Sequence, residues 1–252
     1  QGKTASYDTD VFSSLIAFTE KHSGIKYTNQ YSVEAKSDMA MRVLADHIRA
    51  VSFTIADGEL ASNSGAGYVI RRILRRAVRY YYTFLNIKQP FFYKLVGVLA
   101  SYFEGVFPEL TLQKEFVAKV IEEEEKAFLR TLDAGLKRLE VLTNTGEKIS
   151  GVAAFELFDT YGFPFDLTRL ICSERNTEVD ENGFQTELEK QKARSRAAAV
   201  TETGDWIVLQ EGQTRFVGYD QHEVVGVKIL KYRSVKTKDK TEHQLILDTT
   251  PF

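Results

Sequence analysis

The sequence is poor in the residues that mark exported, membrane-inserted or disulfide-stabilised proteins. Among its 252 residues there is one cysteine, Cys172, so no disulfide can form within the chain, as is typical of a reducing compartment. No apolar run approaches the roughly 18 residues of a membrane-spanning helix, and no signal peptide is recognisable. We therefore expect a cytoplasmic protein that neither spans a membrane nor is exported. We also expect both ends, at Gln1 and Phe252, to be cuts through a longer protein.

Signatures of metal binding and self-contained catalysis are missing as well. The histidines form neither HxxxH nor HExxH, Cys172 has no CxxC partner, and no Ser–His–Asp arrangement is recognisable. Residues 178–189 nearly fit a calcium-binding loop, but Glu178 is too long for the first ligand position and Gln185 replaces an apolar residue. A turn that caps the next helix is the favoured interpretation. We expect no metal ion, no cofactor and no catalytic residue in this chain. The histidines are His22, His47, His222 and His243.

The overall charge excludes a strongly basic nucleic-acid-binding protein. The formal net charge is −2 and the pI about 6.2, whereas many nucleic-acid-binding domains lie above a pI of about 9. The chain is 43% hydrophobic and 27% charged, which is enough apolar material for a buried core. Binding to a nucleic acid would therefore require a local basic patch.

Residues 57–79 contain the strongest local pattern. Residues 57–67 are rich in Gly, Ser and Asn and predict a loop, and residues 68–79 predict a helix in which apolar pairs alternate with arginines. Gly65 and Gly67 lack the third glycine of a dinucleotide-binding motif, because position 70 is Ile70. A tight turn and a single phosphate contact through backbone N–H groups both remain open.

The crowding of positive charge on this helix requires an opposite charge, because guanidinium groups three and four residues apart repel one another. Phosphates suit the planar, permanently charged guanidinium, and carboxylates such as those of Glu122–Glu125 suit it equally well. The residues alone leave both alternatives open. The arginines are Arg71, Arg72, Arg75, Arg76 and Arg79.

Apolar periodicity predicts a mainly α chain that ends in a small, incomplete β module. Pro108 is expected to open the longest helix, which should run to about Leu142. Ser150 is predicted to cap a short helix, and Asp166 to cap the helix 167–175. From Trp206 onwards, short runs rich in Val, Ile and Tyr between Gly and Asp residues predict strands.

Three long motifs resemble alanyl-tRNA synthetase in the same order and with similar spacing. They are ADHIRAVSFTIADGELASNSGAGYVIRRILRRAVR at 45–79, EEEEKAFLRTLDAGL at 122–136 and FELFDTYGFPFDLT at 155–168. The resemblance implies a helical middle domain that recognises tRNA, followed by a small, truncated β-barrel that leads to an editing domain. We accordingly divide the chain into an N-terminal helix and linker (1–36), a tRNA-recognition domain (37–204) and a partial β-barrel (205–252).

The resemblance also implies a binding mode. In this family an Asn and an Asp read a G·U wobble pair in the acceptor stem of the tRNA, and they correspond to Asn63 and Asp159 here. The five arginines become candidates for phosphate contacts, together with Lys190, Lys192 and Arg194. Ala61 and Ala66 stand where the family commonly has Pro and Arg, which alters the loop around Asn63.

For the longer parent enzyme the resemblance implies ATP, Mg²⁺ and Zn²⁺, the attachment of alanine to its tRNA, and no membrane or DNA partner. This chain by itself is expected to be inactive. Two alternatives remain open, namely a helical protein–protein scaffold whose arginines are neutralised internally and a free-standing editing-type protein.

Overall fold

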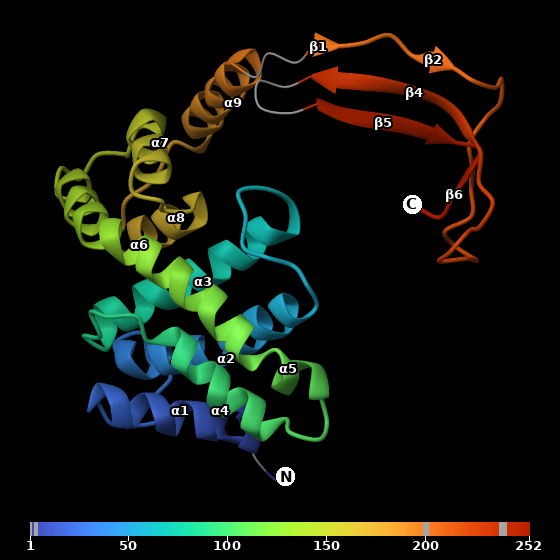
Figure 1. Cartoon of the computed structure of the whole chain (residues 1–252). Coiled ribbons are helices and arrows are strands. Elements are labelled where there is room, and N and C mark those ends of the chain that lie inside the picture. Colours follow the sequence, from blue (N-terminus) through green and yellow to red (C-terminus); the bar gives the residue numbers. More distant parts are fainter. Residues whose placement is uncertain (1, 3–4, 199–201, 237–240) are drawn as a thin grey trace. The chain divides into compact units, whose positions relative to one another are not determined.

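The computed structural model describes residues 2, 5–198, 202–236 and 241–252, and the chain forms two compact units, Gln1–Gln185 and Thr186–Phe252. The first unit is helical and the second contains the strands (Figure 1). This confirms the mainly α fold with a small β module. The domain boundaries inferred from the resemblance stay a prediction. No helix in the described ranges is long and apolar enough to cross a membrane.

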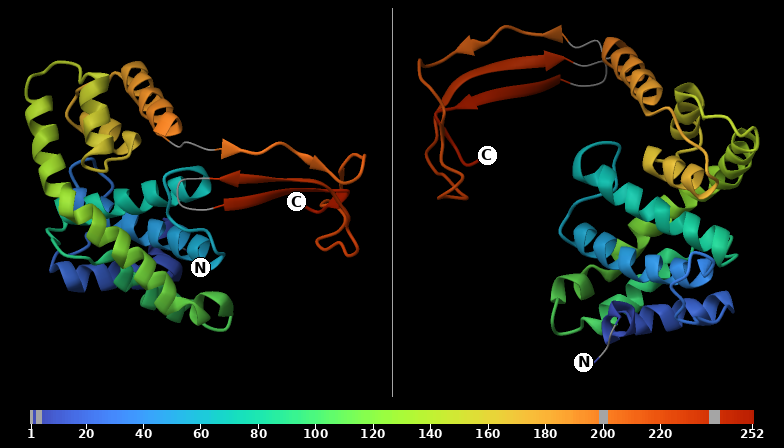
Figure 2. Two further views of the ribbon diagram at one scale, coloured as in Figure 1. Left: turned by 45° about the horizontal axis from the view of Figure 1, so that its top comes forward. Right: turned by 180° about the vertical axis from the view of Figure 1, so that it is seen from behind.

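The first unit begins with three helices packed side by side. They are α1 (Asp10–Ser23), α2 (Lys36–Ala56) and α3 (Gly65–Phe84), and α2 packs against both of the others (Figure 2). A 3₁₀ turn, η1 (Ser6–Asp8), precedes α1. The sequence predicts that Gly24 stops the first helix; α1 does end at Ser23, and Gly24 adopts the left-handed conformation with φ +71°. Apolar residues at helical spacing over 38–55 predict one buried face, and this is the buried face of α2, with Leu44 and Ile48 fully buried.

A carboxylate at the start of α2 holds down the segment that precedes this helix. Asp38 is 1% exposed and accepts hydrogen bonds from the backbone N–H groups of Thr28 and Gln30, at 3.0 and 2.6 Å, and from the Thr28 hydroxyl at 2.9 Å. Burial acts to raise the pKa of Asp38, but these donors outweigh it, so the pKa lies below the ordinary value.

The longest helix, α6 (Lys114–Thr143), packs against α2, α3 and α4. Before it lie the 3₁₀ turn η2 (Phe92–Lys94), α4 (Leu95–Tyr102) and the short α5 (Pro108–Leu112). The expectation that Pro108 opens the longest helix was wrong, because the chain leaves helical geometry at Gln113 before α6 begins. The sequence also predicts one helix over residues 91–103, after Pro90, but this stretch divides into η2 and α4.

Glu125 lies in the core where α6 meets η2. It is completely buried and accepts four hydrogen bonds, from the Tyr81 hydroxyl and from the backbone N–H groups of Phe91, Phe92 and Tyr93. The backbone donors belong to the first turn of η2 and would otherwise have no partner. This acid therefore caps a helical turn 32 to 34 residues earlier in the chain.

Three further helices follow, and the last of them begins in the first unit and continues beyond Gln185 into the second. They are α7 (Gly151–Asp159), α8 (Phe165–Glu174) and α9 (Glu181–Ala198). Ser150 caps α7 as predicted, since its hydroxyl accepts a hydrogen bond from the Ala153 N–H at 3.3 Å. Asp180 accepts from the Gly183 N–H at 3.2 Å, which agrees with the capping turn favoured for residues 178–189.

The second unit contains a sheet and a separate pair of strands. In the sheet, β4 (Ile229–Lys236) pairs antiparallel with β5 (Thr241–Leu247) on one edge and with β1 (Glu202–Thr203) and β2 (Ile207–Val208) on the other. The strands β3 (Arg215–Phe216) and β6 (Thr249–Thr250) pair in parallel. Across the described strands this is an open sheet, and the assignment of residues 205–252 to a partial β-barrel stays a prediction. The sheet begins at Glu202, slightly before the predicted position.

Candidate nucleic-acid interface

Helix α3 presents its five arginines to three carboxylates on two other helices. Because residues four apart share a face of a helix, Arg71 and Arg75 form one pair and Arg72 and Arg76 form another. The first pair contacts Glu124 of α6, the second contacts Asp166 of α8, and Arg79 contacts Glu174 of α8. Five guanidiniums thus share three carboxylates, so the ion-pair network itself keeps an excess of positive charge.

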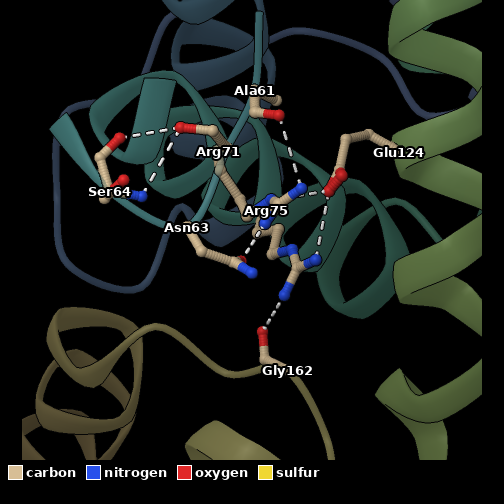
Figure 3. Close-up of polar contacts among 8 residues, drawn as sticks. Ala61, Asn63, Ser64, Arg71, Arg75, Glu124 and Gly162 are labelled. Atoms are coloured by element: carbon tan, nitrogen blue, oxygen red, sulfur yellow. Dashed lines mark hydrogen bonds and ion pairs between the residues drawn. The ribbon is translucent and has the colours of Figure 1, made fainter. Parts of the chain in front are cut away.

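The first pair lies beside the loop that carries Asn63 (Figure 3). Glu124 Oε1 accepts from Arg71 Nε at 2.9 Å and from Arg75 Nη2 at 3.1 Å. Both arginine side chains are mostly buried, at 19% and 15% exposure. Burial lowers the pKa of Arg75, and the neighbouring Glu124 carboxylate acts against that shift. This cluster is therefore an internal ion network with one edge at the surface.

The remaining nitrogen atoms of these two guanidiniums contact two different segments of the chain. Arg71 Nη1 donates to Asn63 Oδ1, and Arg71 Nη2 lies 3.4 Å from the Ala61 carbonyl oxygen. Arg75 Nη1 donates to the Gly162 carbonyl oxygen at 2.5 Å. Gly162 lies in the turn that follows Asp159, the last residue of α7. The two residues named by the family resemblance thus belong to segments held by one carboxylate (Figure 3).

Both of those residues lie at the surface of the first unit. Asn63 and Asp159 are exposed, as the base-reading hypothesis requires. The turn after Asp159 is further anchored to α6, because the Thr131 hydroxyl donates to the Tyr161 carbonyl oxygen at 2.8 Å and the Phe163 ring is buried. Gly162 itself has φ +71°, a conformation that favours glycine.

The loop before α3 packs closely against Gly67. Gly65 and Gly67 were predicted to lie in this loop, but both belong to the first turn of α3. At Gly67 an added Cβ would lie 2.2 Å from the Leu60 carbonyl oxygen and 2.4 Å from the Ser62 hydroxyl. The Ser62 N–H donates to the Gly67 carbonyl oxygen at 3.0 Å. The absence of a side chain at Gly67 therefore lets the loop with Asn63 lie directly on the helix.

The second pair is the more accessible one. Arg72 Nε donates to Asp166 Oδ1 at 2.8 Å and Arg76 Nη2 donates to Asp166 Oδ2 at 3.0 Å, while the arginine side chains remain 39% and 36% exposed. They line a hollow of about 120 Å³ with Val69, Ile73 and Asp166. The prediction that Asp166 caps α8 was wrong, because its carboxylate binds these arginines and makes no capping bond.

Arg79 is an interior residue. Its side chain is 4% exposed and makes two hydrogen bonds to Glu174, and its guanidinium carbon lies 4.8 Å from the centre of the Phe84 ring. Although the sequence placed Arg79 among the candidates for phosphate contacts, this burial leaves it no path to a ligand at the surface, and it supports the fold.

The remaining cationic candidates lie outside the first unit. Lys190, Lys192 and Arg194 are exposed on α9 beyond Gln185, and Lys190 Nζ is 2.7 Å from Glu187 Oε1. Their contribution to phosphate binding stays a prediction. Among the described residues, no group of three or more His, Cys, Asp or Glu side chains is arranged to hold a metal ion.

Comparison with known proteins gives a consistent result. Alanine–tRNA ligases of Cytophaga hutchinsonii, Porphyromonas gingivalis and Bacteroides fragilis are 57%, 53% and 52% identical to the chain. In each case the match covers 100% of this chain and 29% of the relative, so the chain spans less than a third of the relatives' length. These relatives confirm the resemblance to alanyl-tRNA synthetase. The profile of the family described as tRNA synthetases class II (A) matches residues 1–252, and the chain therefore belongs to this family.

Proposed function

We propose that this chain is the tRNA-recognition part of an alanine–tRNA ligase, and that Asn63 and Asp159 together read a G·U pair in the acceptor stem. The observation that carries the proposal is the shared anchoring of their two segments. Arg71 binds the side chain of Asn63, Arg75 binds the turn after Asp159, and Glu124 joins both arginines. The segments that carry these two exposed polar residues, far apart in the sequence, are thereby bound to one network.

The direction of the Asn63 amide supports the hydrogen-bonding scheme. A guanidinium only donates hydrogen bonds, so the atom of Asn63 that faces Arg71 must be the carbonyl oxygen. The amide NH₂ group is then left to donate to a ligand, while the carboxylate of Asp159 can only accept. The surface therefore offers one donor and one acceptor.

A wobble pair matches this combination. In the shallow minor groove of A-form RNA, a G·U pair leaves the guanine N2 amino group without a partner and presents the uracil O2 acceptor. Asp159 accepts from the amino group and Asn63 donates to the acceptor side. A G·C pair already uses the amino group and an A·U pair lacks it. Each unmatched contact costs about 1–3 kcal/mol, so two contacts discriminate by roughly a hundredfold.

The backbone of the RNA is assigned to the exposed arginines. Arg72 and Arg76 keep more than a third of their side-chain surface accessible and share a single carboxylate, so phosphate oxygens can reach the remaining N–H groups. Such contacts add affinity for any RNA stem and carry no sequence information. In the longer enzyme, ATP and Mg²⁺ would serve alanine activation and Zn²⁺ would serve editing, and we assign none of them to residues of this chain.

The proposal is tested by titrating the chain with two acceptor-stem hairpins that differ only in a G·U or a G·C pair. At low salt the wild type should bind the G·U hairpin more tightly, and Asn63→Ala and Asp159→Ala should each reduce the preference about tenfold. Exposed residues elsewhere in the first unit, Asn144→Ala and Asp133→Ala, are the matched controls and should leave it unchanged. Equal affinity of the wild type for both hairpins would refute base reading.

The scaffold alternative is favoured by one observation, the internal pairing of all five arginines with carboxylates. It requires that the chain bind neither hairpin above the level of an unrelated acidic protein. The same titration therefore separates the two functions.

A further inference from the structure

Glu124 occupies a special place in the arginine network. A single oxygen atom, Oε1, accepts from both Arg71 and Arg75, and the Glu124 side chain is only 11% exposed. In such a partly desolvated place, charge-assisted hydrogen bonds are stronger than at an open surface. The position of this one atom consequently fixes the two guanidiniums relative to each other.

Each of the two guanidiniums also binds a different segment, one carrying Asn63 and the other following Asp159. Arg71 holds the Asn63 side chain from α3, and Arg75 holds the Gly162 carbonyl oxygen in the turn after Asp159 (Figure 3). Without the shared carboxylate, the two positive charges one helical turn apart would repel each other. Arg71 would then turn away and release the amide of Asn63.

We propose that Glu124 is a positioning residue that sets the spacing and orientation of the two base-reading groups without contacting RNA itself. This inference rests on the proposed function of Asn63 and Asp159. It assigns Arg71 and Arg75 to the positioning of the readers, and leaves Arg72 and Arg76 as the arginines of α3 that face a ligand.

The chain contains its own control for this proposal. Asp166 binds both Arg72 and Arg76, as Glu124 binds both Arg71 and Arg75. It also joins two arginines four residues apart, and its side chain is 12% exposed. In this second network Arg72 and Arg76 bind Asp166, whereas the bonds to Asn63 and to the Gly162 carbonyl oxygen come from Arg71 and Arg75. Glu124→Gln and Asp166→Asn each remove one negative charge beside two arginines of the same helix. Only Glu124→Gln affects the arginines that bind Asn63 and the turn after Asp159.

The experiment measures the ratio of G·U to G·C hairpin affinities for the wild type and both variants. Glu124→Gln should lower the ratio about tenfold, because one oriented contact is lost, while its affinity for the G·C hairpin stays equal or rises with the added positive charge. Asp166→Asn should strengthen both complexes alike and keep the ratio. A ratio in Glu124→Gln equal to that of the wild type, or an equal loss in both variants, would overturn the proposal.

A second readout does not depend on RNA preference. The side-chain amide signals of Asn63 in a ¹H–¹⁵N spectrum should shift and exchange faster in Glu124→Gln and remain in place in Asp166→Asn. If the wild type shows no preference for G·U, base reading fails, and these signals alone decide whether Glu124 positions Asn63. Unchanged signals in both variants would overturn the positioning claim.

A further variant keeps the proposal testable if Glu124→Gln does not fold, as judged by circular dichroism. Arg71→Lys retains the positive charge but loses the planar fork that contacts Glu124 and Asn63 at the same time. The affinity ratio should fall about tenfold although Glu124 is intact. An unchanged ratio in this variant would show that the network does not orient Asn63.

Discussion

Replacing Glu125 by Gln should destabilise the first unit, because the buried carboxylate accepts four hydrogen bonds. Its Oε1 atom accepts from the Tyr81 hydroxyl at 2.7 Å and from the N–H groups of Phe91 and Phe92 at 2.9 and 2.7 Å. Its Oε2 atom accepts from the Tyr93 N–H at 2.9 Å. A glutamine keeps one acceptor oxygen but places an NH₂ group opposite a donor.

The size of the effect follows from the bonds that a glutamine cannot make. Whichever way the amide is turned, at least one backbone N–H of η2 faces another donor in a place without solvent. An unsatisfied buried donor costs about 1–3 kcal/mol, and here two donors oppose each other. The remaining bonds also lose the assistance of the negative charge. We expect a loss of about 2–4 kcal/mol, a large part of the 5–15 kcal/mol that is ordinary for a domain.

Urea unfolding followed by circular dichroism measures this loss as a shift of the midpoint at unchanged slope. The matched control is Glu123→Gln, two residues before Glu125 in the same acidic run, since its side chain is 63% exposed and contacts Lys126. The control should change the free energy of unfolding by less than about 0.5 kcal/mol. If Glu125→Gln is as harmless as the control, the capping role of Glu125 is refuted.

Three further outcomes are expected. Asp38→Asn should lower the free energy of unfolding by about 2 kcal/mol at neutral pH, because it weakens charge-assisted hydrogen bonds. The difference from the wild type should shrink as the pH falls through and below 3.8, the ordinary pKa of an aspartate. An acid with a lowered pKa stabilises the fold only while it is ionised. Gly162→Ala would place a Cβ on a left-handed backbone, 2.6 Å from a guanidinium nitrogen of α3. The melting temperature should therefore fall more than for Gly105→Ala, since Gly105 also has a positive φ, of +79°, but open space around it. Gly67→Ala should lower the melting temperature by displacing the loop before α3, whereas Gly97→Ala, unobstructed inside α4, should raise it slightly.

Local signals in the sequence predicted the parts of the fold that depend on a few neighbouring residues. The left-handed Gly24 after α1 and the capping Ser150 before α7 act within one helical turn, so their residue types are informative. Helix breaks depend on more distant packing. Pro108 does begin a helix, but nothing in the local periodicity distinguishes α5 from α6, because the four-residue spacing of apolar residues continues from Leu112 to Phe116 across the break at Gln113.

The partners of the acidic run could not be read from the sequence. Four identical glutamates follow one another, and their surroundings differ completely in the fold. Glu124 pairs with arginines on α3, Glu125 lies in the core and binds Tyr81 and the backbone of η2, and Glu122 and Glu123 contact Lys126. Successive residues of a helix differ by about 100° in direction, so the face of each is predictable but the element opposite that face is not.

The candidate site depended on resemblance rather than on pattern. By its own chemistry Asn63 is an ordinary loop residue, and Asp159 ends a short helix with no basic neighbour in the sequence. What relates them is a chain of side-chain bonds from α3 to α6 and to the turn after α7, over separations of 49 to 87 residues. Such long-range pairings belong to the folded state.

The two interpretations of the arginine helix, internal neutralisation and phosphate binding, turn out to be compatible because the arginines are not equivalent. The helical repeat divides them among three carboxylates, and burial then ranks them, with Arg79 fully enclosed, Arg71 and Arg75 mostly covered, and Arg72 and Arg76 one-third exposed or more. The ion pairs with carboxylates already order the arginine side chains. A phosphate contact therefore costs less conformational entropy than it would with mobile side chains. An exposed ion pair can exchange part of its bonding for a phosphate oxygen, whereas an enclosed pair cannot. Under the proposed function, the contribution of α3 to the salt dependence of RNA binding should therefore arise from Arg72 and Arg76, and the choice between base pairs from the network around Glu124.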